Sequence, residues 1–159
     1  MNFRNGYILG ATTEVIKKWW PRLKKNKFHF TSEQTPYYNC FSWAMKVTNI
    51  WMDMYYFSNK FNIKYSELDH SANGYAEILK KYFNYEICPD GSFEKNMEKV
   101  VLYENKYGEW THIARQLDNG NWTSKLGKLE DIEHYNINCL SDGDYGNPVI
   151  YMRKQKIDS

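Results

Sequence analysis

The stretch WTHIARQLDNGNWTSKLG, residues 110–127, decides the second half of the fold. Residues 110–117 alternate in side-chain character, which is typical of a β-strand. Asn119-Gly120 follows, and Asn-Gly between two strand-like runs is the strongest short signal for a hairpin turn. Residues 121–127 then run back beside the first strand. The stretch therefore predicts an antiparallel hairpin.

Further strands are expected on both sides of this hairpin. Residues 99–106, KVVLYENK, are typical of a preceding strand, and residues 147–154, NPVIYMRK, are typical of a closing one. Between them, residues 128–134, KLEDIEH, have the length and character of one helical turn. These segments together predict an antiparallel β-meander.

The first half of the chain has helical patterns. Thr12 or Thr13 can cap a short helix that Pro21 ends. Its predicted inward positions are Val15, Ile16, Trp19 and Trp20. Ser71 can cap a clearer helix over residues 72–84. The inner face of that helix is predicted to carry Tyr75, Ile78, Leu79 and Tyr82. Residues 26–38 are expected to form an ordered loop, and residues 51–69 fit no single pattern.

Helices followed by an antiparallel meander indicate an α+β fold. The 159 residues fit one domain, 1–159, and 42% of them are hydrophobic, which suffices for a packed core. No apolar run is long enough to span a bilayer, and the N-terminal residues lack the apolar region of a signal peptide. We therefore expect a cytoplasmic protein that does not bind membranes, unless a non-classical export route applies.

The cysteines indicate neither a disulfide framework nor a structural zinc site. Cys40, Cys88 and Cys139 are odd in number and far apart, and the sequence contains no CxxC pair or HExxH motif. It also lacks the glycine-rich loops that bind nucleotide phosphates. We expect no metal and no cofactor.

A basic segment is the one feature that could favour nucleic acid. Residues 17–27, KKWWPRLKKNK, contain six Lys and Arg residues and no acid. Lysines interleaved with tryptophans can bind phosphates and stack on bases. One short patch is a weak footprint, however, and a solvated helix end explains it more simply. Nucleic acid is therefore the less favoured partner.

Cys40 is placed at the start of a predicted helix. Asn39 is a good N-cap for the run CFSWAMKVTNIWM, residues 40–52. The residues at helical spacing on one face of that run are Cys40, Trp43, Ala44 and Val47. A helix N-terminus lowers the pKa of a thiol, and its free N–H groups can stabilise an oxyanion. Cys40 is therefore the candidate nucleophile.

A thiol nucleophile needs a base, for which histidine is the usual residue. Of the candidates His29, His70, His112 and His134, we favour His112, because it lies on a predicted strand and is therefore held rigidly. Alternation places Ala114 on the same face, where its small side chain leaves room for the end of the Cys40 helix. Ser124 or Lys125 returns near His112, and the hairpin register decides which of them faces it.

These residues resemble the papain-like, NlpC-type cysteine peptidases. The resemblance rests on YNC-x-x-W at 38–43, followed by a sheet in which a strand opens with His112. It implies a papain-like core in which Cys40 is the nucleophile, His112 the base and Ser124 the third polar residue. The sequence departs from the family at that third position, where His, Asn or Gln is usual. The family often has a small residue two positions after the nucleophile. Here that position is Ser42, and the bulky Phe41 comes before it.

Residues 36–152 more specifically resemble a family of small uncharacterised bacterial proteins. The shared motifs are YNC-x-x-WA and TH-x-ARQL-x-NG-x-WTSKLG-x-x-EDIEH. Papain-like enzymes also place a glutamine in the oxyanion hole shortly before the nucleophile, and the resemblance suggests Gln34 for that role. Trp43 and Lys125 are the remaining candidates for the oxyanion and substrate side of the site.

Two functions remain open at this point. The first is a cysteine hydrolase or amidase, such as a peptidase, deamidase or acyltransferase, acting on a peptide or another amide-containing substrate. The second is a non-catalytic binding or interaction domain on the same fold, which the serine at position 124 favours because serine orients an imidazole poorly. The substrate and the oligomeric state are not predicted by the sequence.

Overall fold

The computed structural model describes residues 3–4, 7–8 and 10–157. Two short strands, β1 (Phe3–Arg4) and β2 (Tyr7–Ile8), pair antiparallel with each other. Helix α1 (Thr13–Trp19) then begins after Thr12, whose Oγ1 accepts a hydrogen bond from the N–H of Val15. Trp20 is buried, but Trp19 is 44% exposed, so only one of the two tryptophans packs inward.

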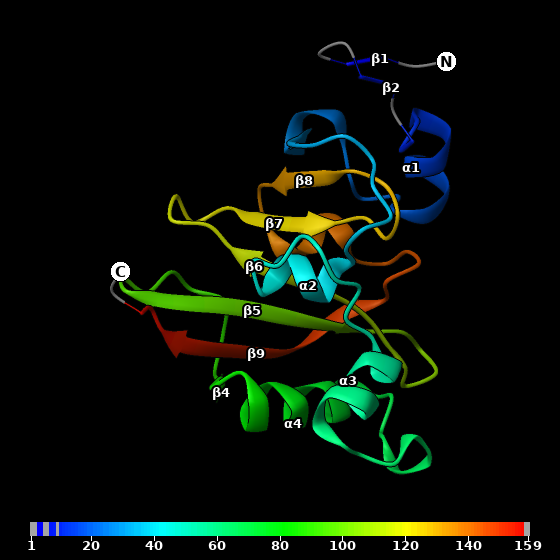
Figure 1. Cartoon of the computed structure of the whole chain (residues 1–159). Coiled ribbons are helices and arrows are strands. Elements are labelled where there is room, and N and C mark those ends of the chain that lie inside the picture. Colours follow the sequence, from blue (N-terminus) through cyan, green and yellow to red (C-terminus); the bar gives the residue numbers. More distant parts are fainter. Residues whose placement is uncertain (1–2, 5–6, 9, 158–159) are drawn as a thin grey trace.

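Within the described residues, seven strands form one antiparallel sheet in the order β3-β8-β7-β6-β5-β9-β4. Figure 1 shows the long strands β5 and β9 side by side, with β6, β7 and β8 following on one side. The bounds are Phe28–Phe30 for β3, Glu86–Cys88 for β4, Met97–Glu104 for β5, Trp110–Gln116 for β6, Trp122–Lys125 for β7, Asp131–His134 for β8 and Asn147–Gln155 for β9. The helices and this sheet confirm the α+β class.

The predicted hairpin over 110–127 is confirmed. Its turn closes where the N–H of Leu117 donates to the carbonyl of Asn121 at 2.7 Å. Gly120 has φ +89°, a conformation that glycine adopts without steric cost. The ladder between β6 and β7 pairs Arg115 with Thr123 and Gln116 with Trp122.

The structure corrects two expectations about the sheet and confirms a third. Residues 131–134 form the strand β8 instead of part of a helical turn, because they pair with β7 on one side and β3 on the other. The expected loop 26–38 contains that partner β3 and is preceded by the short 3-10 helix η1 (Lys25–Lys27). The predicted closing strand is confirmed as β9, and it is internal to the sheet because β4 pairs along its outer edge.

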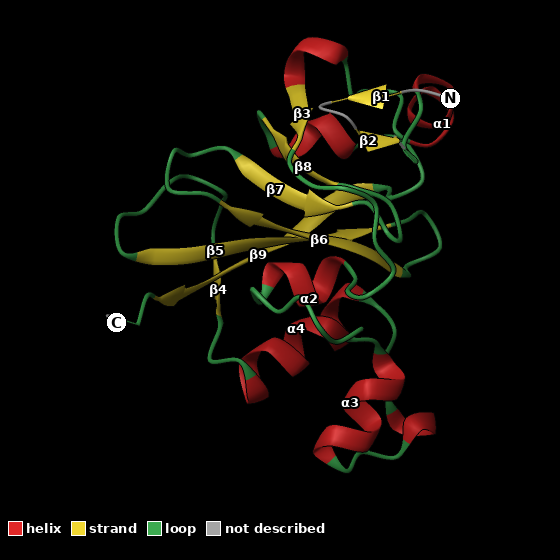
Figure 2. Cartoon of the chain, turned by 45° about the horizontal axis from the view of Figure 1, so that its top comes forward, coloured by secondary structure: helices red, strands yellow, loops and turns green. Residues whose placement is uncertain are grey.

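Helices α2 (Cys40–Ala44) and α4 (Ala72–Tyr82) lie against one face of the sheet, and α3 (Met54–Phe61) lies on the same side, farther from the strands, as Figure 2 shows. Two further 3-10 helices are η2 (Tyr65–Glu67) and η3 (Ile137–Leu140). Helix α4 begins after Ser71 as predicted and buries three of its four predicted inner residues. The fourth, Tyr82, is 38% exposed and stacks on Phe61 at 3.7 Å between ring centroids.

Helix α2 is shorter than the predicted run 40–52. It ends at Ala44, and Lys46 then adopts φ +64°. The chain folds back on the helix, because Ser42 Oγ donates to the carbonyl of Ile50 at 2.6 Å and accepts from the N–H of Met52 at 3.0 Å. Val47 is therefore partly buried outside the helix.

Strand alternation divides the buried side chains between two clusters, one on each face of the sheet. The first cluster joins α2, α3 and α4 to alternate residues of the sheet, which are Val100, Leu102, Ile113 and Met152. The second lies on the opposite face with Trp20 of the N-terminal region, and its sheet residues include Val101, Tyr103, Ala114, Trp122 and Ile132. Alternate side chains on β6 therefore face different clusters: Ile113 faces the first and Ala114 the second.

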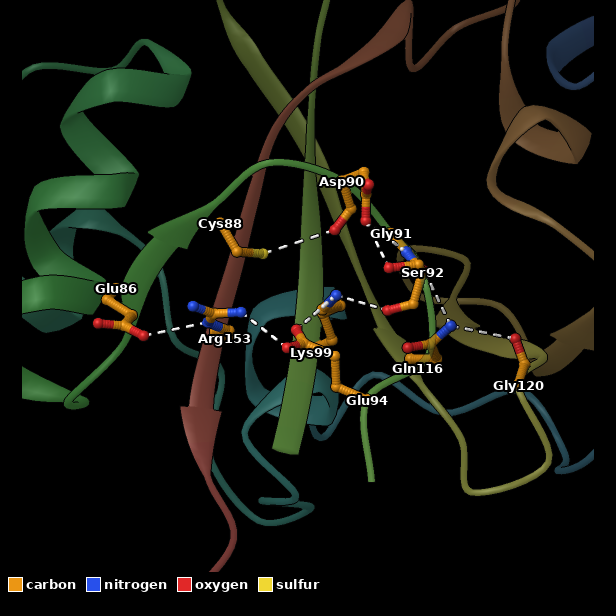
Figure 3. Close-up of polar contacts among 10 residues, drawn as sticks. All are labelled: Glu86, Cys88, Asp90, Gly91, Ser92, Glu94, Lys99, Gln116, Gly120 and Arg153. Carbon is orange, nitrogen blue, oxygen red and sulfur yellow. Dashed lines mark hydrogen bonds and ion pairs between the residues drawn. The ribbon is translucent and has the colours of Figure 1, made fainter. Parts of the chain in front are cut away.

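A polar network holds the outer strand β4 to β9 and β5 (Figure 3). Arg153 of β9 donates to Glu86 at 3.0 Å and to Glu94 at 2.7 Å. Glu94 also pairs with Lys99 Nζ at 2.8 Å, and the Lys99 side chain is only 2% exposed. The buried ammonium is thus compensated by a carboxylate, as a buried charge must be.

No helix among the described residues is long and apolar enough to cross a membrane.

Candidate functional site

Cys40 is the first residue of α2, as predicted. Asn39 caps the helix, with its Oδ1 accepting from the N–H of Ser42 at 3.0 Å. The Asn39 side chain is itself held by the carbonyl of Met52, to which its Nδ2 donates at 2.7 Å. The position of Cys40 on the backbone is therefore rigidly defined.

The electrostatics at Cys40 differ from the expectation. Burial raises the pKa of the thiol to about 11 and outweighs the opposing backbone N–H groups of Ile113, Phe41 and Cys40 and the charge of Lys125. The side chain is buried in the first cluster, and α2 has only five residues, so its macrodipole is small. The resting group at neutral pH is therefore the protonated thiol.

The side chain of His112, on β6, is fully buried. Its ring stacks on that of Tyr145, with centroids 4.1 Å apart and an interplanar angle of 3°, and Tyr103 lies 5.4 Å away. Burial, with the neighbouring His134, lowers the pKa of His112 well below its usual value. The imidazole is therefore neutral at physiological pH.

Ser124 is the residue that faces His112, which answers the question of register. Its Oγ lies 2.9 Å from His112 Nε2. Because β7 pairs with β6 through Thr123 and Arg115, Ser124 falls on the face of His112, and Lys125 falls on the opposite one. The structure thus brings together two of the three residues proposed as catalytic.

A second histidine, His134, extends this contact. Its Nε2 lies 2.8 Å from Ser124 Oγ, and its Nδ1 lies 2.9 Å from the carbonyl oxygen of Asn136. Our sequence interpretation missed His134 because it placed residues 128–134 in a helical turn. The signal was present in the alternation of Ile132 and His134, which on a strand beside β7 share the face of Ser124.

Helix α2 approaches β6 on a different face from the one we expected. Arg115 lies over the Trp43 ring at 5.4 Å, and Trp43 Nε1 donates to Thr123 Oγ1 at 2.9 Å. The helix thus covers the face of Ile113 and Arg115, whereas the room beside Ala114 is occupied by the second cluster. Trp43 anchors the helix to the hairpin.

The relation between Cys40 and His112 follows from this packing. The N–H of Ile113, the residue next to His112, opposes the burial that raises the pKa of the Cys40 thiol. Burial first, and then the nearby Cys40, raises the pKa of Tyr145, on which His112 stacks. Within the described part of the chain, His112 Nδ1 is buried and has no hydrogen-bond partner. The structure therefore joins His112 to Ser124 by a hydrogen bond and does not join it to Cys40.

The Lys125 ammonium binds backbone carbonyls of the protein itself. Its side chain is fully buried, and its ammonium donates to the carbonyls of Thr35, Gly127 and Leu129 at 2.8, 2.7 and 2.5 Å. Burial lowers the pKa of this amine to about 8. These contacts connect the segment before Cys40 to the turn after β7. The Lys125 ammonium, which we had expected to bind substrate, therefore already has three acceptors within the protein.

Gln34, the predicted oxyanion residue, lies beside Gly10. The residue is exposed, and its Oε1 would be 2.3 Å from a Cβ placed on Gly10, where the Leu129 side chain also packs. No hydrogen bond of the described residues joins Gln34 to α2. The residues around the sulfur that can donate to an oxyanion are instead the backbone N–H groups of Cys40, Phe41 and Ile113.

The other predicted features are placed as follows. In the basic segment, Arg22 pairs with Asp142 at 3.0 Å, and Lys27 lies over the Tyr135 ring at 5.3 Å. The three cysteines are free thiols, and no group of His, Cys, Asp or Glu in the described residues has an arrangement that could hold a metal ion. A cavity of about 640 Å³ opens between residues 104–107 and 142–149, and its lining does not include Cys40 or His112.

The comparisons with known proteins place the chain in a family without an assigned activity. Residues 29–153 match the model of a domain of unknown function, DUF7689. This range contains α2, the seven-stranded sheet apart from Phe28 and residues 154–155, and the His112–Ser124–His134 contacts. Neither the curated proteins nor the solved structures contain a match to the chain. The chain therefore belongs to the DUF7689 family of domains of unknown function.

Proposed function

We propose that this protein is a cysteine-dependent hydrolase or acyltransferase of papain-like type that acts on amide bonds. The observation that carries the proposal is the position of Cys40 at the start of α2, against the backbone N–H of Ile113 and next to His112, whose Nδ1 is buried without a hydrogen-bond partner among the described residues. The His112 side chain faces the second cluster, on the other side of β6 from α2, so the reaction requires the thiol and the imidazole to approach each other. A buried polar atom without a partner has an energetic cost that proteins rarely retain without a role. A thiol that gives up its proton to this atom would satisfy it.

The proposed reaction uses Cys40 as nucleophile and His112 as general base. The thiol proton passes to His112 Nδ1 while the sulfur forms a bond to the carbonyl carbon of the substrate. The resulting oxyanion collapses, the C–N bond breaks, and Nδ1 returns the proton to the leaving amine. Water then attacks the thioester and releases the acid, or an acceptor amine takes the acyl group, with His112 accepting the attacking proton in either case.

The arrangement of the chain supports a papain-like site. A capped helix begins at Cys40, an antiparallel strand carries His112, and the next strand carries the polar residue Ser124 in contact with the imidazole. The backbone N–H groups of Cys40, Phe41 and Ile113 surround the sulfur and could donate to the oxyanion. Each part of an acyl-transfer site thus has a candidate group.

A second function is favoured by a different observation. Cys40 is only 8% exposed and its pKa is raised to about 11, so at rest it resembles a core cysteine. On that basis the chain would be a non-catalytic binding domain, with Cys40 as a packing residue. The two functions differ in whether Cys40 can be acylated.

The test uses p-nitrophenyl acetate, an activated acyl donor, with the modified cysteines identified by peptide mass mapping. Cys88 and Cys139 are matched internal comparators, because each is 5% exposed. Acylation of Cys40 at least about tenfold faster than of either comparator, followed by loss of the acetyl group, supports a hydrolase.

The same assay on His112→Phe and Cys88→Ala identifies the base. His112→Phe should slow acylation of Cys40 by about a hundredfold, within the range typical of general-base catalysis. Cys88→Ala should leave it unchanged. If Cys40 gains an acetyl group no faster than Cys88 and Cys139 in the folded protein, the hydrolase proposal is rejected and the binding-domain function stands.

A further inference from the structure

Ser124 contacts not only His112 but also a second buried histidine, His134. We propose that His134 is a positioning residue that acts through Ser124 to keep the proton of His112 on Nε2 and a lone pair on Nδ1. The inference rests on the proposed function of His112 as the base for Cys40. It assigns a role to a buried histidine that does not contact Cys40.

The direction of the hydrogen bonds is determined at the far end. His134 Nδ1 lies 2.9 Å from the carbonyl oxygen of Asn136, which can only accept. His134 Nδ1 must therefore carry a proton. Because His134 is fully buried and its pKa is lowered to about 4, the ring is neutral, and its Nε2 has a lone pair.

This direction passes through Ser124 to His112. At 2.8 Å from an accepting His134 Nε2, the Ser124 hydroxyl must donate its single proton there. Its contact with His112 Nε2 at 2.9 Å then requires the imidazole to donate. His112 therefore has its proton on Nε2, and Nδ1, which is buried and has no partner in the described part of the chain, is the free base.

The Asn136 carbonyl that sets the direction is itself held in place. The Asn136 side chain accepts from the N–H of Cys139 at 3.2 Å and caps η3. The next carbonyl, of Ile137, accepts from the Tyr103 hydroxyl, and the N–H of Tyr135 donates to the carbonyl of Lys27 at 2.9 Å. The carbonyl thus belongs to a turn anchored to β5 through Tyr103 and to η1 through Lys27.

The arrangement explains why a serine can stand at the third position. An amide side chain has separate donor and acceptor ends, whereas a hydroxyl rotates and can either donate or accept. Ser124 alone would therefore allow both tautomers of His112. With His134 as an obligatory acceptor, only one orientation of the hydroxyl satisfies both rings, and the weakness of serine as an orienting residue is removed.

Tautomers can be read directly from nitrogen-15 NMR shifts of histidine ring atoms in correlations with the ring C–H protons. In the wild-type protein at neutral pH, we expect His112 with the proton on Nε2 and His134 with the proton on Nδ1. In His134→Phe, which keeps a ring but removes the acceptor, the Ser124 hydroxyl is free to donate to His112. We then expect His112 to move wholly or partly to the tautomer with the proton on Nδ1.

His29→Phe is the matched control, because His29 lies on β3 beside β8 and its side chain is 52% exposed. It should leave the His112 signals unchanged. The acylation rate of Cys40 with p-nitrophenyl acetate should fall at least about tenfold in His134→Phe, because an N–H in place of the lone pair cannot accept the thiol proton.

A wild-type His112 with its proton on Nδ1 overturns the inference, as does a folded His134→Phe protein in which the tautomer of His112 is unchanged. If His134→Phe does not fold, the wild-type spectrum and that of Ser124→Ala decide, since Ser124→Ala should give His112 a mixture of tautomers. Failure of the proposed function is distinguishable, because it leaves the expected tautomers in place while Cys40 is not acylated.

Discussion

His112 Nε2 lies 2.9 Å from Ser124 Oγ, just beyond the last ladder pair of Arg115 and Thr123. The contact is therefore diagonal across the hairpin, and side chains instead of backbone hold the two strands together there. The other ring nitrogen of His112, Nδ1, is buried and has no hydrogen-bond partner among the residues that the structure describes. The predictions below test the charges and contacts that surround this pair.

The reactivity of Cys40 toward iodoacetamide should rise steeply with pH. Alkylation requires the thiolate, and burial raises the pKa of Cys40 to about 11. The rate constant should therefore increase about tenfold per pH unit from neutral pH up to about pH 10. The measurement uses a Cys88→Ala, Cys139→Ala double variant, in which Cys40 is the remaining thiol. A rate that reaches its plateau near neutral pH would instead indicate an ion pair with His112.

Protonation of His134 should destabilise the fold in acid. Its pKa is about 4 in the folded protein and about 6.5 when unfolded, so between these values the unfolded chain binds the extra proton. The contribution of His134 to stability is thus present above about pH 6.5 and is lost as the pH falls toward 4. In His134→Phe, the free energy of unfolding should depend less steeply on pH in this window, by up to about 1.4 kcal/mol per pH unit. Urea titrations at several pH values measure this slope, and an unchanged slope contradicts the neutral, buried state.

Lys125→Met should destabilise the fold although it removes a buried charge. The ammonium donates to the carbonyls of Thr35, Gly127 and Leu129, and methionine leaves these acceptors without that donor. We expect a loss of at least about 2 kcal/mol in the free energy of unfolding. Lys128→Met, an exposed position three residues along, should change it by less than about 0.5 kcal/mol. If urea denaturation gave the same free energy of unfolding for both variants, the three hydrogen bonds of Lys125 would not contribute to stability.

The network of Figure 3 should depend on Glu94 more than on Glu86. Glu94 pairs with both the buried Lys99 and Arg153, whereas Glu86 pairs with Arg153 alone. Glu94→Gln leaves the Lys99 ammonium buried without its counter-charge, which is the more costly loss. The midpoint of thermal unfolding should therefore fall further in Glu94→Gln than in the matched Glu86→Gln. A larger fall for Glu86→Gln would contradict the assignment of Glu94 as the central acid.

Much of the fold was predictable because its signals are local. Asn39, Ser71 and Thr12 cap their helices through contacts within a few residues, and the turn at Asn119-Gly120 closes over four residues. Such contacts form whatever the rest of the chain does. The hairpin, two of the helices and the position of Cys40 at a helix start were accordingly predicted correctly.

The incorrect predictions involve partners that lie outside the repeat of a local pattern, from eight residues away, as for Ser42 and Ile50, to about a hundred, as for β8 and β3. Residues 131–134 form a strand because β3 and β7 flank them, and β3 lies about a hundred positions earlier in the chain. The predicted helix 40–52 stops at Ala44 because Ser42 binds residues that fold back over it. No local pattern contains either pairing.

Local sequence signals were enough to predict a capped cysteine, a histidine on a strand, and a hairpin whose alternation separates Ser124 from Lys125. The face of β6 that the Cys40 helix covers, the depth at which the thiol is buried, and the contact of His134 with Ser124 depend on the packing of distant segments. The reason is physical. Local backbone preferences act over a few residues, whereas burial and hydrogen-bond direction depend on groups that folding brings together.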